Sequence, residues 1–215
     1  MENPQETPNP GDGYFLNVHR LSIEFLDKLA LPKEPYPIDV ISNELRLKLE
    51  DRKDVFTSSL RDYSPLRVEA RLRDDVPVGM NTVGMLADRW TILILKEWCL
   101  RNKLGKTEAA TELVEKQTTE ILAALRVAVP GNSSLNSKLT HLGGYSKADN
   151  WEEAFAGLFT INILLWESQE TLYQRDLEVL PGEELRKYIQ FFSRGNVERN
   201  EYIELCESRY WTAYE

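Results

Sequence analysis

Residues 81–103 limit the possible folds of this chain more than any other stretch. They read NTVGMLADRWTILILKEWCLRNK, contain neither Gly nor Pro after Gly84, and are long enough for about six helical turns. At about 100° per residue the apolar side chains point in all directions, which is typical of a helix buried on every side. Asp88, Arg89 and Lys96 nevertheless lie among them, and buried charge requires partners. The stretch therefore predicts a central buried helix that carries a polar site.

Segments on both sides of this stretch also carry apolar residues at helical spacing, with breaks rich in Pro and Gly between them. Pro181 and Gly182 separate the last two segments tightly enough for an antiparallel hairpin. No strand or repeat is evident. The predicted class is all-α, a multi-helix bundle around a central buried helix at about 80–103, with a C-terminal antiparallel helical hairpin. The other helices are expected at about 14–30, 39–63, 64–73, 107–129, 151–180 and 182–211.

The length of 215 residues fits a single domain with a sizeable core. The polar, Pro-rich residues 1–12 predict a disordered tail. We expect residues 13–215 to form one helical domain, in which 14–78 are an N-terminal helical extension and 80–213 are the core bundle.

Composition excludes several classes of function. The net charge of −9 argues against nucleic-acid or anionic-membrane partners, which require basic surface. No apolar run approaches the ~20 residues of a membrane span, and the N-terminus lacks a signal pattern, so a cytoplasmic protein is expected. Cys99 and Cys206 fall among large apolar residues and are expected to be core thiols. His19 and His141 have no local ligand partner, so neither a metal site nor a cofactor is expected.

Polar residues interrupt the buried face of the two C-terminal predicted helices. Each helix has aromatic and aliphatic residues at three- and four-residue steps, which include Tyr173 and Ile189 and predict that both are buried. Amide and charged side chains fall inside these stripes or at their edges. They are Asn162, Gln169 and Glu170 in the first helix and Asn196, Arg199 and Asn200 in the second.

Such groups cost several kcal/mol each when buried without partners, so they are expected to meet one another and the polar residues of the central helix. Two interpretations stay open. The groups form a buried hydrogen-bond network that fixes the register of the helices, or they line a pocket for a small polar ligand. Trp90 and Trp166 would line such a pocket, although large aromatic residues at helical spacing are more often core.

The same residues carry a resemblance to known families. The central helix resembles the signature helix of two uncharacterised bacterial families, domain of unknown function 4254 and its relative 6165. Their pattern is Thr/Ser-x-Gly-x-Leu-x-Asp-Lys/Arg, followed by Ile and Lys. The matching residues here are Thr82, Gly84, Leu86, Asp88, Arg89, Ile92 and Lys96.

Two later blocks of these families also have counterparts, in the same order. Gln169 stands where the families prefer an acid, and Leu172-Tyr173 replace an expected Arg. The resemblance implies an association with genes for envelope polysaccharide and glycosyl transfer, but no activity that carries over. The matching residues are Asn162, Trp166, Gln169 and Glu170, then Asn196, Arg199 and Asn200.

The leading hypothesis is a helical accessory or small-ligand-binding protein. Its polar cluster would bind an anionic or sugar-nucleotide-like molecule or a protein partner, with cations to attract the ligand and carboxylates and amides to orient it. The residues assigned to this site are Thr82, Asp88, Arg89, Lys96, Asn162, Trp166, Glu170, Asn196, Arg199 and Asn200.

Two alternatives remain. Glu167-x-x-Glu170 and Glu198-x-x-Glu201 are similar to the paired carboxylates with which all-α nucleoside-triphosphate pyrophosphohydrolases hold Mg²⁺. The helical pattern disfavours this enzyme, because it predicts that the second pair is solvated. The other alternative is a scaffolding module that uses its acidic exterior or its aromatic C-terminus. We expect those aromatic residues, Tyr210, Trp211 and Tyr214, to dock back onto the body instead.

Overall fold

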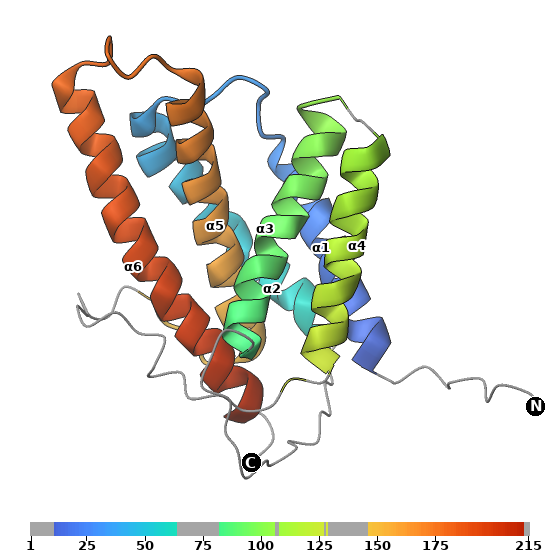
Figure 1. Ribbon diagram of the computed structural model, residues 1–215. Coiled ribbons are helices and arrows are strands. Elements are labelled where there is room, and N and C mark those ends of the chain that lie inside the picture. The colour runs from blue at the N-terminus through green and yellow to red at the C-terminus, as the bar shows by residue number, and fades with distance from the viewer. Residues whose placement is uncertain (1–10, 64–81, 106–107, 127, 129–145, 213–215) are drawn as a thin grey trace, which may run out of the picture.

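The computed structural model describes residues 11–63, 82–105, 108–126, 128 and 146–212. It confirms the all-α class, because every regular element among them is helical. Helices α6, α5, α3 and α4 follow one another across the view in Figure 1, and α1 and α2 lie behind them. The elements are α1 (Gly11–Leu29), the π-helix η1 (Val40–Leu45), α2 (Arg46–Arg61), α3 (Val83–Asn102), α4 (Glu108–Arg126), α5 (Trp151–Gln174) and α6 (Gly182–Thr212).

The core lies around α3 and α5. Most of α3 is buried, as expected for the central helix, and α5 is buried even more continuously, since every residue from Ala154 to Leu165 is buried. Aromatic rings connect the two helices: the centroids of Trp90 and Phe155 are 5.2 Å apart. Helix α5 also packs against α2 and α6, so it is a second central helix.

Helices α1 and α2, which the sequence assigned to an extension, contribute to the same hydrophobic core. Phe25 of α1 stacks on Phe56 of α2 with centroids 4.6 Å apart, and both rings contact Phe159 of α5. Helix α1 begins at Gly11, two residues inside the predicted tail. The predicted helix at 64–73 lies outside the described residues, as do residues 1–10.

Helix α6 crosses α3 and α5 at glycines. A Cβ atom on Gly84 would lie 2.1 Å from the backbone oxygen of Ile203, and one on Gly157 would lie 2.0 Å from the ring of Tyr202. The absence of a side chain at these two positions therefore permits the close approach that brings α6 next to both central helices.

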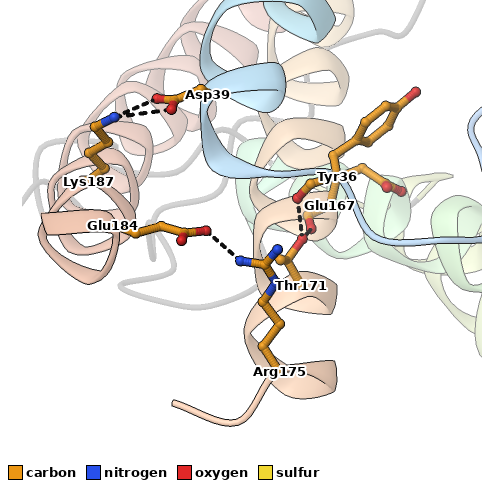
Figure 2. Close-up of polar contacts among 7 residues, drawn as sticks. All are labelled: Tyr36, Asp39, Glu167, Thr171, Arg175, Glu184 and Lys187. Atoms are coloured by element: carbon orange, nitrogen blue, oxygen red, sulfur yellow. Dashed lines mark hydrogen bonds and ion pairs between the residues drawn. The ribbon is translucent and has the colours of Figure 1, made fainter. Parts of the chain in front are cut away.

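The C-terminal hairpin is present, but its first helix is shorter than predicted. Helix α5 ends at Gln174, six residues before the predicted end at 180. The Asp176 carboxylate accepts a hydrogen bond from the Glu178 backbone N–H at 3.0 Å, a local turn that competes with the helix. The connection is held by an ion pair between Arg175 and Glu184 (Figure 2).

The start of η1 is fixed to this end of the hairpin by polar contacts. The Thr171 hydroxyl donates to the Tyr36 backbone oxygen at 2.8 Å, and Lys187 Nζ lies 3.0 Å from both oxygens of Asp39 (Figure 2). The predicted burial of Tyr173 and Ile189 is wrong, because the two side chains are 74% and 59% exposed. Both lie towards this end of the hairpin, where α5 and α6 turn part of their apolar stripes to solvent.

Candidate functional site

Asp88 is the centre of a buried polar network. Its side chain lies on α3 and is only 5% exposed. Arg199 of α6 donates to it through two atoms: Nε lies 2.7 Å from Oδ1, and Nη2 bonds to Oδ2. This fork-to-carboxylate geometry is the strongest form of side-chain ion pair. Because the Arg199 side chain is 31% exposed, it connects the buried acid to the surface.

Asn162 of α5 adds the third helix to this network. Its Nδ2 donates to Asp88 Oδ1 at 3.0 Å and to Thr91 Oγ1 at 2.8 Å, while the Thr91 hydroxyl donates to the Asp88 backbone oxygen at 2.7 Å. Asp88, Asn162 and Thr91 are all buried. The structure therefore brings together polar side chains from α3, α5 and α6, and these contacts fix how the three helices lie against one another.

A groove with a volume of about 410 Å³ opens beside this network, between α3, α4 and α6. We call it the α3 groove. Arg89 and Lys96 line it together with Asp88 and Arg199, and they are exposed rather than buried inside the bundle as expected. Among the described residues neither Arg89 nor Lys96 has an ion-pair partner. The remaining walls are formed by Ile92, Leu93, Gln117, Glu120 and Ile121.

Two other predicted site residues bond to the backbone. Thr82 is the N-cap of α3, where its side-chain oxygen accepts from the Met85 N–H at 3.3 Å. Asn196 donates to the Phe192 backbone oxygen at 2.8 Å, one turn earlier in α6.

The remaining three predicted site residues, Trp166, Glu170 and Asn200, are partly buried and do not line the α3 groove. Glu170 accepts from Gln174 at 3.4 Å, one turn further along α5. The helical stripe placed Trp166 one turn from Asn162. The groove does not reach Trp166, because it opens on the side of α3 that faces α4.

A second buried ion pair was not assigned to the site by the sequence. Glu167 of α5 is 1% exposed, and its Oε1 lies 2.7 Å from Nζ of Lys103, just beyond the end of α3. Desolvation raises the pKa of the Glu167 carboxyl, although the Lys103 ammonium partly opposes the shift. Burial also raises the pKa of the neighbouring Cys99 thiol to about 11. The sequence analysis identified Glu167 only as part of a Glu-x-x-Glu spacing, because a helical wheel does not show which cation faces this carboxylate.

Two further buried contacts were also missed. Glu207 of α6 accepts from the Gly84 N–H at 2.9 Å and so places a carboxylate at the N-terminus of α3. His19 of α1 bridges two residues of α3, with Nε2 2.8 Å from Glu97 Oε2 and Nδ1 accepting from Trp90 Nε1 at 3.1 Å. Both contacts join residues more than 70 positions apart in sequence, so no local spacing indicates them.

The paired carboxylates of the pyrophosphohydrolase hypothesis do not form a metal site. Glu198 pairs with Arg46 of α2 at 3.1 Å, and Glu201 accepts from the Ser146 backbone N–H at 2.9 Å. Both side chains are half-buried instead of fully solvated, because α2 and the segment before α5 contact them. Among the residues that the structure describes, no group of three or more His, Cys, Asp or Glu side chains is arranged to hold a metal ion.

The two described C-terminal aromatic residues, Tyr210 and Trp211, dock onto the body, as expected. Tyr210 is 1% exposed and packs on Trp151 with ring centroids 5.2 Å apart, and Trp211 is partly buried against the hydrophobic core. Tyr214 lies outside the described residues. Cys99 and Cys206 are free and buried, as predicted.

Comparisons with protein families, with curated proteins and with solved structures found no match. The resemblance to the two families of unknown function therefore stays a prediction. None of the described helices combines the length and the apolar character that a membrane span requires.

Proposed function

We propose that this chain is an accessory protein that binds a small anionic, sugar-nucleotide-like ligand in the α3 groove. The observation that carries the proposal is the set of three cations on one groove: Arg199, held in place by buried Asp88, and the unpaired Arg89 and Lys96. A cation that has no protein partner is available to a ligand at a small desolvation cost.

The spacing of these cations favours an extended ligand. Arg89 and Lys96 are seven residues apart on α3, which places their Cα atoms about 10 Å apart along the helix axis. Apolar Ile92 lies between them on the same groove wall. A molecule with a charged phosphate portion and a less polar ring would match this alternation of cationic and apolar surface.

Charge supports the selection of an anion. The chain has a net charge of −9, so most of its surface repels anions, and a local group of cations directs them to one place.

We also propose that the protein works in the cytoplasm, because a reducing compartment keeps thiols such as Cys99 and Cys206 free.

The test is a thermal-shift screen of the full chain against nucleotides and sugar nucleotides, followed by calorimetry on any ligand that stabilises it. Arg89→Ala and Lys96→Ala are each expected to weaken binding by about tenfold, the loss of one charge-assisted contact. Arg186→Ala is the matched control, because Arg186 is also exposed and helical but does not line the α3 groove. No stabilisation at millimolar ligand, or equal losses in all three variants, would refute the proposal.

A further inference from the structure

The π-helix η1 points to a second site. A π-helix is rare and is frequently found at functional sites. Here the Arg46 N–H donates to the Ile41 oxygen, five residues back. The carbonyl of Asp39 is satisfied by two side chains, Asn43 Nδ2 at 2.9 Å and Ser42 Oγ at 3.4 Å. These side-chain donors support the wide turn that starts η1.

The wide turn faces a groove on α6, which we call the α6 groove. Ser42 and Arg46 form one wall, and Phe191 and Arg194 of α6 form the other. The cavity between them has a volume of about 440 Å³. A second cavity of about 280 Å³ continues along α2 and α6, with Thr160 of α5 in its lining.

The ion pair between Arg46 and Glu198 lines both cavities, so it lies at the point where they adjoin. The two guanidinium nitrogens of Arg46 donate to the two carboxylate oxygens at 3.3 and 3.1 Å. Glu198 precedes Arg199 directly, and successive residues of a helix point about 100° apart. The α6 groove and the α3 groove therefore lie on different sides of α6.

Within the part of the chain that the structure describes, one cation of the α6 groove has no ion-pair partner. Lys187 is paired with Asp39, and Arg46 is paired with Glu198. Arg194, exposed on α6, has no ion-pair partner among the described residues. The groove thus offers a free guanidinium opposite the Ser42 hydroxyl, next to the partly buried ring of Phe191.

We propose that the α6 groove binds a small oxyanion ligand, a phosphate or a carboxylate, through Arg194. The guanidinium fork matches two oxygens of either group. Phe191, which lines the same groove, packs against the ligand body. The site is independent of the α3 groove, because the two share no lining residue.

The test uses the full chain with isotope-labelled arginine and follows the side-chain Nε–H resonances by NMR at constant ionic strength. Arg194→Lys, Arg186→Lys, Arg199→Lys and Arg46→Lys assign four resonances by their disappearance. Inorganic phosphate and citrate are the two probes. The Arg194 resonance is expected to shift to saturation with at least one of them, while Arg186, exposed on the same helix and outside the groove, shifts little and without saturation.

The two arms identify the ligand chemistry: saturation with phosphate alone indicates a phosphorylated ligand, and saturation with citrate alone a carboxylated one. In the Arg194→Ala variant, the half-saturation concentration of the shift followed at Arg46 should rise about tenfold. An Arg194 shift that stays linear, as at Arg186, overturns the proposal. A saturable shift at Arg199 alone also overturns it, while supporting the α3 groove.

Discussion

Removal of Arg199 tests whether Asp88 depends on it for charge compensation. The Arg199→Ala variant leaves a carboxylate that is 5% exposed without its only guanidinium partner. Breaking a buried ion pair in this way costs about 3–5 kcal/mol. Asn162 still donates to Asp88 Oδ1, so we expect the free energy of unfolding to fall by the lower end of that range, about 3 kcal/mol.

The two halves of the pair should be unequal. In Asp88→Asn, the charge left behind belongs to Arg199, which is 31% exposed and can be solvated. We therefore expect a smaller loss, about 1–3 kcal/mol, mostly from hydrogen bonds that the amide satisfies less well. The Arg175→Ala variant is the matched control: it breaks an ion pair with Glu184 whose side chains are 41% and 26% exposed, and such a surface pair is worth less than about 1 kcal/mol.

The measurement is urea unfolding followed by far-ultraviolet circular dichroism, with the slopes of the transitions compared before the stabilities are. The expected order of destabilisation is Arg199→Ala, then Asp88→Asn, then Arg175→Ala. A loss in Arg199→Ala no larger than that in Arg175→Ala would show that Asp88 does not need its partner, and the account of the network would be wrong.

Two further predictions concern packing and pH. Gly84→Ala places a Cβ atom 2.1 Å from the Ile203 oxygen and should lower the free energy of unfolding, measured in urea, by about 1–3 kcal/mol. Gly13→Ala has nothing within 4 Å of the new atom and should raise the free energy of unfolding by about 0.5–1 kcal/mol. Equal effects of the two substitutions would contradict the close approach of α6 to Gly84. Because burial raises the pKa of Glu167 in the folded state, folded protein takes up a proton more readily than unfolded protein as pH falls. The difference in unfolding free energy between the wild type and Glu167→Gln should therefore rise as pH falls from neutrality towards the ordinary glutamate pKa of 4.5. A difference that stays flat or falls over this pH interval would contradict the raised pKa of Glu167.

The all-α class and the position of most helices followed from local pattern. The run from Val83 to Asn102 has a capping Thr82 and no internal break, so its sequence predicts the helix that the structure shows. The same pattern identified polar residues on the inner faces, and Asp88, Asn162 and Arg199 do meet. Local pattern failed at the end of α5, where the Asp176 turn stops the helix.

Local sequence was enough to predict most of the helical segments and the inward direction of Asp88 and Asn162, because both follow from the fixed rise and rotation of a helix. The tertiary structure determines the partners: Arg199 for Asp88, Lys103 for Glu167 and Arg46 for Glu198. It also decided that Arg89 and Lys96 line an open groove. A helical wheel gives the direction of each side chain, whereas burial and ion pairing depend on which other helix lies in that direction.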